Sequence, residues 1–131
     1  MSDAKTLTSQ KIEDFISFLE NAAKEYAAAK DEVDRRSQKN IDYLHDLEFA
    51  SNKNERNRVA TKVHKNQIAR REAKDRMQLN DKLAKFYLDQ GNRPFFKKLK
   101  SLIAEQKKTE EYLQSDRHYT RRVGEKNEDD S

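Results

Sequence analysis

The chain of 131 residues has no cysteine and no tryptophan, and it has only 2 glycines and 1 proline. Without cysteine it can form neither a disulfide nor a thiolate metal site. Without glycine-rich segments it lacks the loops that cradle phosphate groups in many nucleotide-binding enzymes. Because residues that end helices are so rare, long stretches of the chain are free to continue as one helix.

Long apolar runs are also missing. No run approaches the roughly 20 residues that a membrane span needs, and the first ten residues hold no basic segment followed by an apolar core. We therefore expect no membrane contact and no signal peptide, and we expect the protein to act in the cytoplasm. Apolar residues make up 34% and charged residues 40% of the chain. Long helices, each burying one narrow stripe, suit this composition better than a round globule does.

The first helix is expected from about residue 9 to 50, where apolar side chains recur at heptad spacing. Thr8 or Ser9 is expected to cap it. One heptad row is typical of a coiled-coil seam, and we predict that it joins two copies of the chain. The row is Ile12, Leu19, Tyr26, Val33 and Asn40. Its polar member, Asn40, is expected to favour one register at some cost in stability.

The second helix is expected from about residue 54 to 89, antiparallel to the first because the polar turn at 51–54 is short. Asn52 followed by Glu55 resembles a capping box. One face of this helix is expected to pack on the first helix, and the opposite face to be covered by the segment that follows. The first face holds Val59, Val63, Ala73 and Met77, with Asn66 and Arg70, and the opposite face holds Ile68, Leu79, Leu83 and Phe86.

Gly91 is expected to end the second helix in a left-handed conformation, and Asn92 and Pro94 to open a third helix over 93–115. These elements predict one all-α domain over 1–116, an elongated antiparallel hairpin plus a shorter third helix. Because the third helix covers only part of the hairpin, we expect a second copy to complete the bundle as a homodimer. The polar tail at 117–131 is expected to be largely disordered.

Positive charge is concentrated in the second helix. Residues 1–50 carry a net charge of −4 and residues 51–131 a net charge of +8. Two explanations are open: pairing with acids of the first helix, such as Glu13, Glu20 and Glu32, or a face for an anionic partner. For the second explanation we predict contact with a nucleic-acid backbone or another partner. The candidate residues are Arg56, Arg58, Lys62, Lys65, Arg70, Arg71 and Lys74, with Arg121 and Arg122 in the RHYTRRV segment of the tail.

Catalytic and metal-ligating patterns are weak. Asp42 and His45 lie three residues apart on one helical turn, as in half of a metal site in a helical bundle. The other helices do not supply further carboxylates at a matching depth. We therefore expect no metal, no cofactor and no enzymatic activity.

Three short segments stand out: YLHDLE at 43–48, ERNRVATKVHKNQIARREAKD at 55–75 and HYTRRV at 118–123. Together they resemble a group of small helical early-region proteins from phages and prophages of Gram-positive bacteria. The resemblance implies a protein that acts in the bacterial host cell without a cofactor, by binding a host protein or a ribonucleoprotein complex. An anti-CRISPR role would fit that context, and the net positive charge argues against mimicry of DNA.

These observations predict a non-enzymatic protein that modulates or inhibits the nucleic-acid machinery of a host, with an RNA-guided nuclease complex as one possible target. A second hypothesis is a protein that uses its basic helix on the phosphate backbone of DNA or RNA. A third is a structural or assembly protein of the coiled-coil type, whose charges only keep it in solution.

Overall fold

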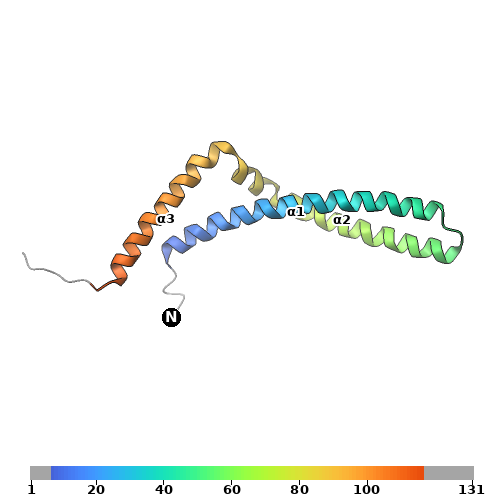
Figure 1. Ribbon diagram of the computed structural model, residues 1–131, viewed down its shortest axis with the longest axis horizontal. Coiled ribbons are helices and arrows are strands. Elements are labelled where there is room, and N and C mark those ends of the chain that lie inside the picture. Colours follow the sequence, from blue (N-terminus) through green and yellow to red (C-terminus); the bar gives the residue numbers. More distant parts are fainter. Residues whose placement is uncertain (1–6, 117–131) are drawn as a thin grey trace, which may run out of the picture.

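The computed structural model describes residues 7–116, which form three α-helices and one short 3₁₀ helix (Figure 1). Their bounds are α1 (Thr8–Glu48), α2 (Lys53–Leu88), η2 (Gln90–Asn92) and α3 (Arg93–Gln114). Within 7–116 there is no strand, so the predicted all-α class is confirmed. No helix in this range is long and apolar enough to cross a membrane. The predicted disordered tail, with Arg121 and Arg122, lies outside the described residues.

Helices α1 and α2 form the predicted antiparallel hairpin. The turn between them is fixed by Asn52, whose Oδ1 accepts a hydrogen bond from the Glu55 backbone N–H at 2.8 Å. The Glu55 carboxylate accepts from the backbone N–H of Ser51 at 2.9 Å and from its hydroxyl at 3.0 Å. These bonds, the backbone one above all, hold the pKa of Glu55 below its ordinary value. The expected capping box is therefore present, with its return bond shifted to the residue before the cap.

Small side chains line the seam between the two helices. Ala22 and Ala29 of α1 and Ala73 and Ala84 of α2 are buried, and Ala73 has an exposed fraction of 0%. Alanines let the two backbones approach closely, but each buries little apolar area. Near the middle of the hairpin polar contacts add to this packing, and they fix which residues of the two helices lie opposite each other.

Two of these polar contacts join α2 to consecutive residues of α1. The side-chain amide of Asn66 donates to the carbonyl of Arg36 at 2.8 Å. The Arg70 Nε donates to the hydroxyl of Ser37, also at 2.8 Å. A shift by one residue would break both bonds and leave the buried Asn66 side chain unsatisfied, so they specify one register.

The heptad row predicted as an oligomer seam lies on the packed side of α1. Leu19 is buried, and Ile12, Tyr26, Val33 and Asn40 are half-buried within a single chain. The Oδ1 atom of Asn40 is buried and has no hydrogen-bond partner among the described residues. Because this side of α1 already packs inside one chain, a role between two copies stays a prediction.

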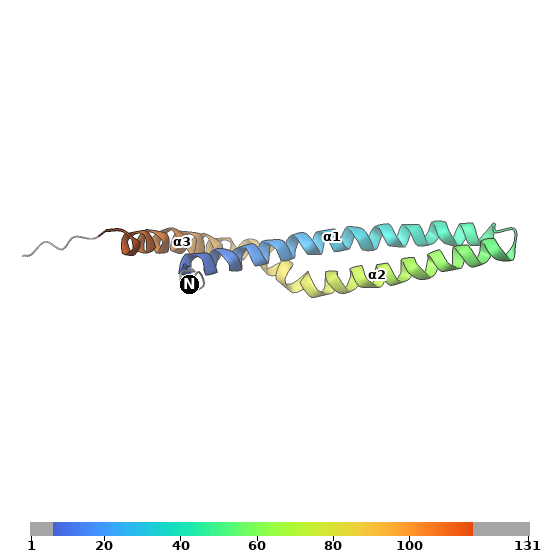
Figure 2. The ribbon, with the colours of Figure 1, turned by 90° about the horizontal axis from the view of Figure 1, so that it is seen from below.

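Helix α3 turns back toward the start of α1, close to it near Thr8 and Ser9 and farther from it toward the elbow (Figures 1 and 2). Its buried residues Phe96, Ile103 and Glu110 recur every seven positions; Glu110 binds the start of α1, and Phe96 packs on Phe86 and Tyr87 of α2. The expectation that the third helix covers the outer face of α2 holds only at Phe86, whose ring contacts Phe95 and Phe96. For the rest of that face it is wrong, because Ile68 and Leu79 are exposed, Leu79 by 76%.

The elbow is built differently from the predicted left-handed glycine cap. No residue in the range 7–116 has a positive φ, so the prediction for Gly91 is wrong. Instead, the Asp89 carboxylate accepts from the Gly91 N–H at 2.9 Å, and the Asp89 carbonyl accepts from the Asn92 N–H at 3.0 Å. Asn92 is the N-cap residue of α3, as expected, but its side chain donates to the Phe86 carbonyl at 3.0 Å. Asp89 thus supplies the local acceptors that make a left-handed turn unnecessary.

A carboxylate from α3 caps the start of α1. The N-cap position of α1 is Leu7, and neither Thr8 nor Ser9 caps the helix as predicted. Glu110 Oε2 accepts from the Ser9 N–H at 2.8 Å and the Thr8 hydroxyl at 2.9 Å, and Oε1 accepts from the Ser9 hydroxyl at 2.7 Å. Burial raises the pKa of Glu110, but these hydrogen bonds outweigh it and hold the pKa below its ordinary value. We call this group, Glu110 with Thr8 and Ser9, the Glu110 clasp.

Candidate nucleic-acid interface

The three helices differ strongly in charge. Helix α2 carries 11 Lys and Arg against 4 Asp and Glu, whereas α1 carries 6 against 10. An acidic and a basic helix packed side by side could neutralise each other through ion pairs. Whether they do so decides if the charge of α2 is available to a partner.

The ion pairs of the described residues do not join α1 to α2. Glu32 pairs with Arg35 and Arg36 of its own helix, the latter at 2.7 Å, and these hydrogen bonds, that of Arg36 above all, lower the pKa of Glu32. Glu13 pairs across to Lys107 of α3 at 3.3 Å. The remaining pair, Asp81 with Lys85 at 3.1 Å, lies within α2. Within residues 7–116 the seven candidate cations of α2 therefore form no ion pair with α1, although Arg58 lies near Glu55 of its own helix and adds to the hydrogen bonds that lower the pKa of that carboxyl. Pairing between the two helices does not account for the basic helix.

Together with Arg76, which also makes no ion pair within residues 7–116, these seven cations divide into two rows, because α2 is one continuous helix with 3.6 residues per turn and its seam to α1 lies between them. We name the rows after one member each. The Arg70 row, on one side of the seam, is Arg56, Arg70, Arg71 and Lys74. The Lys65 row, on the other side, is Arg58, Lys62, Lys65 and Arg76.

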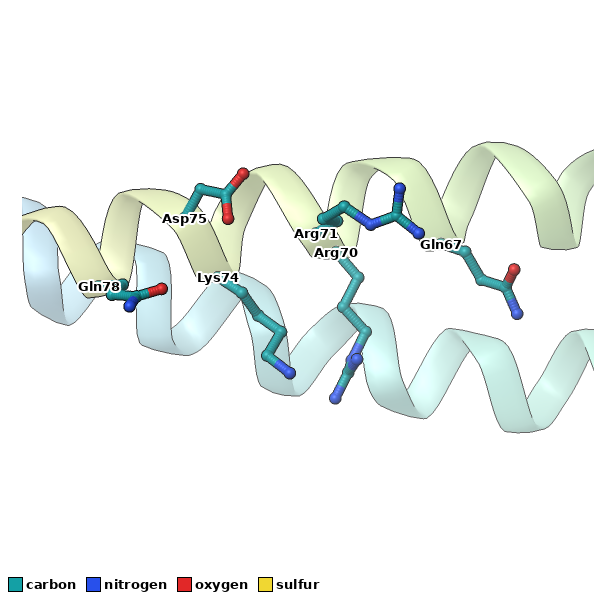
Figure 3. Close-up of a pocket in the computed structure, with 6 residues that line it drawn as sticks. All are labelled: Gln67, Arg70, Arg71, Lys74, Asp75 and Gln78. Carbon is teal, nitrogen blue, oxygen red and sulfur yellow. The ribbon is translucent and has the colours of Figure 1, made fainter.

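Three members of the Arg70 row, Arg70, Arg71 and Lys74, line a shallow hollow of about 400 Å³ together with Gln67, Asp75 and Gln78 (Figure 3). We call it the Arg70 hollow. Arg70 and Lys74 extend from α2 across the neighbouring helix and Gln67 points toward the same side, while Arg71 and Asp75 stay over α2. The bond from Nε to Ser37 orients the Arg70 guanidinium, whose other N–H groups have no carboxylate partner in the described residues. The hollow thus presents three cations and two amides against one carboxylate.

The sequence prediction omitted Arg76 from the contact residues. The spacing of the basic residues could have identified it. Arg58 precedes Lys65 by seven residues and Arg76 follows Lys65 by eleven, and both intervals are close to whole numbers of helical turns.

Asp42 and His45, the residues of the weak metal-site pattern, are exposed. The part of the chain that the structure describes holds no group of three or more potential metal ligands.

A second cationic hollow at the elbow was not predicted from the sequence. It measures about 600 Å³ and is lined by Tyr87, Arg93, Pro94, Phe96, Lys97 and Lys100. Its cations come from the first two turns of α3, at positions four and three residues apart, and therefore on one face of that helix. Tyr87 and Phe96 pack against each other with ring centroids 5.3 Å apart. We call this site the elbow hollow; no carboxylate lines it.

No family model, curated protein or solved structure matches this chain.

Proposed function

We propose that this protein is a non-enzymatic binding protein that acts on nucleic-acid machinery by laying the cations of α2 on a phosphate backbone. The observation that carries the proposal is the absence of ion pairs between α2 and the acidic helix α1 within residues 7–116. Eight unpaired cations in two rows, spread over about 30 Å of helix, form a surface whose natural partner is a polyanion.

The arrangement favours contact with phosphates over the reading of bases. Lys and Arg contacts to phosphates give affinity that does not depend on sequence and that falls with salt, because counterions are released. The Arg70 row is interleaved with the amides of Gln67 and Gln78, which can donate to phosphate oxygens as well. The rigid hairpin holds both rows at fixed spacing.

The resemblance to early-region phage proteins supports the biological context of the proposal. A protein that covers the backbone of a guide RNA or of a target duplex would compete with a host enzyme for that backbone. Such competition needs no catalytic group and no cofactor. The protein would then modulate or inhibit a host nuclease, polymerase, helicase or RNA-guided complex.

The test is equilibrium binding of labelled duplex DNA and structured RNA to the double variant Arg71→Gln/Lys74→Gln. Both side chains are exposed and make no ion pair within residues 7–116, so the variant should fold normally. The matched control, Lys24→Gln/Lys108→Gln, removes the same charge from exposed positions on α1 and α3. We expect the Arg71/Lys74 variant to lose affinity about tenfold and the control to lose little. Equal losses would mean that only net charge matters, and no binding by the wild type would refute the proposal.

Self-association is a second candidate function, supported by a separate observation. Leu79 and Phe86, seven residues apart on α2, and Phe95 and Leu102, seven apart on α3, are all exposed. The rings of Phe86 and Phe95 are in contact with centroids 6.3 Å apart, so these two form an exposed aromatic pair, and Leu79 and Leu102 lie one heptad farther along their helices. Exposed patches of this kind mark interaction sites. Light scattering on the wild type and on Leu79→Glu should show a dimer that the variant disrupts, and a wild-type monomer mass would exclude this candidate.

A further inference from the structure

The elbow hollow combines exposed cations with aromatic rings. Arg93, Lys97 and Lys100 are exposed cations, and Tyr87 and Phe96 place aromatic rings beside them. None of the three cations makes an ion pair within residues 7–116. Proteins that bind single-stranded nucleic acid use this combination, in which cations hold the backbone and aromatic rings hold the bases.

The stability of α3 does not explain these cations. Residues 93–100 hold four Lys and Arg and no Asp or Glu, and the first turn, which is the positive end of the helix dipole, contains Arg93 and no acid. Acids would be favourable there and cations are unfavourable. In α3 the acids Glu105, Glu110 and Glu111 all lie in the second half instead. A charge distribution that opposes the dipole, in side chains without partners, points to an external anion.

The hollow also continues the Lys65 row. Tyr87 follows Arg76 by eleven residues, and Arg76 follows Lys65 by eleven, so the three share one face of α2. The distance from Arg76 to Tyr87 is about 16 Å along the helix axis. A backbone lying on the Lys65 row would therefore be led directly into the elbow hollow.

We propose that the elbow hollow binds a nucleotide unit at a single-stranded end of a nucleic acid whose duplex part lies on α2. Lys97 and Lys100 contact phosphates, and Tyr87 supplies a ring face or edge for the base. The inference rests on the proposed function of α2, but it adds a separate site and a preference for strands with an unpaired end.

The experiment compares three labelled ligands: a blunt DNA duplex, the same duplex with a short single-stranded end, and the single strand alone. For the wild type we expect the end to raise affinity over the blunt duplex about tenfold, the low end of the effect of one base stacked on an aromatic ring plus its phosphate contacts. The variant Lys97→Gln/Lys100→Gln should lose that gain and keep the affinity for the blunt duplex. Its salt dependence on the single strand should weaken by about 1.4 log units per log unit of salt.

Tyr87→Leu and Tyr87→Phe separate stacking from charge. The phenylalanine keeps the ring that packs on Phe96, so its binding should match the wild type, whereas leucine should lose about tenfold on the single strand. Circular dichroism melts of both variants show whether the elbow stays folded.

Two results would overturn the inference. One is a wild type that binds the blunt duplex and the duplex with an end equally well, which leaves the α2 proposal intact. The other is no detectable binding of the single strand, whatever happens with the duplex. The Arg71→Gln/Lys74→Gln variant gives a supporting result if it binds the blunt duplex about tenfold more weakly but still gains affinity from the single-stranded end as the wild type does. The two sites would then act separately.

Discussion

The two halves of the hairpin are held together in different ways. Near the Asn52 turn only α1 and α2 are present (Figure 2). The polar contacts of Asn66 and Arg70 join them, and the buried side chains of this part are small, Asn66, Ala29 and Ala73. At the other end α3 joins them, and Leu19, Phe96 and Ile103 are buried there. We call these the two-helix half and the three-helix half.

The two halves differ in what they contribute: one mainly stabilises the fold, and the other mainly exposes charge. The three-helix half buries large apolar side chains and also contains the Glu110 clasp, so it should supply most of the free energy of folding. The two-helix half has a narrow seam and carries most of the unpaired cations of α2. A thin rod exposes more of the surface of α2 than a bundle would, which suits a helix that binds a long anionic partner.

The largest effect on stability is expected from Phe96→Ala in the three-helix half. Phe96 is 8% exposed and contacts the rings of Phe86, Tyr87 and Phe95. Its truncation should lower the free energy of unfolding by about 3–5 kcal/mol. The measurement is urea denaturation followed by circular dichroism. Phe49→Ala is the control, because Phe49 is 77% exposed near the turn and should change the free energy by less than about 0.5 kcal/mol. Similar losses from both variants would remove the distinction between the halves.

A smaller loss is expected from enlarging the seam of the two-helix half. Ala73→Leu inserts a large side chain where the exposed fraction is 0%. The two helices must move apart, and the free energy of unfolding should fall by about 1–3 kcal/mol. Because the separation of the helices weakens the packing around position 73, hydrogen exchange of 66–74 should also become faster. Unchanged stability would show that the seam is looser than the structure indicates.

Asn40→Leu should change stability in the opposite direction. The buried Oδ1 of Asn40 has no hydrogen-bond partner in the described part of the chain, so an apolar side chain of similar size removes an unsatisfied acceptor. We expect the free energy of unfolding to rise by about 1 kcal/mol in the same denaturation assay. Gln38→Leu, at an exposed position nearby, serves as the control for added hydrophobicity. A loss of stability in Asn40→Leu would mean that Asn40 makes a needed contact.

The Glu110 clasp should give the smallest effect, and one that depends on pH. The folded-state pKa of Glu110 lies below its ordinary value, so the clasp stabilises the fold above the unfolded pKa of about 4.3, and this contribution is lost as the pH falls through the folded pKa. Glu110→Gln should melt about 3 °C below the wild type at neutral pH. The difference should disappear in strong acid. A difference that persists there would assign the effect to packing and not to charge.

The sequence predicted the helices well because their signals are local. Heptad spacing, the scarcity of glycine and proline, and the Asn52–Glu55 pattern each act within a few turns of one helix. The bounds that result differ from the observed ones by at most two residues.

The sequence did not predict which face α3 covers or what caps α1. Glu110 lies about a hundred residues from Ser9 in the chain, and no periodicity connects a carboxylate on one helix with the first turn of another. The direction of α3 depends on the elbow, where Asp89 and Asn92 form hydrogen bonds to backbone groups. Asp and Asn can bind the backbone in several kinds of turn, so their presence in the sequence does not predict this one.

The composition of the sequence identified the basic helix, but it did not show whether the acids of α1 neutralise its charge. Charge counts alone allow α1 and α2 to neutralise each other, and only the positions of Glu13 and Glu32 show that their partners are Lys107 and arginines of α1. The elbow hollow was missed because its aromatic rings and cations come from two helices that the sequence does not place together.

The central claim is that the unpaired cations of α2 bind phosphates, and a salt series tests it most directly. The measurement is the binding constant of the wild-type protein for blunt duplex DNA over a range of monovalent salt concentrations. If at least four cations of α2 contact phosphates, the logarithm of the binding constant should fall with the logarithm of salt with a slope of about −3.6 or steeper. A slope near zero, or no binding at low salt, would contradict the account.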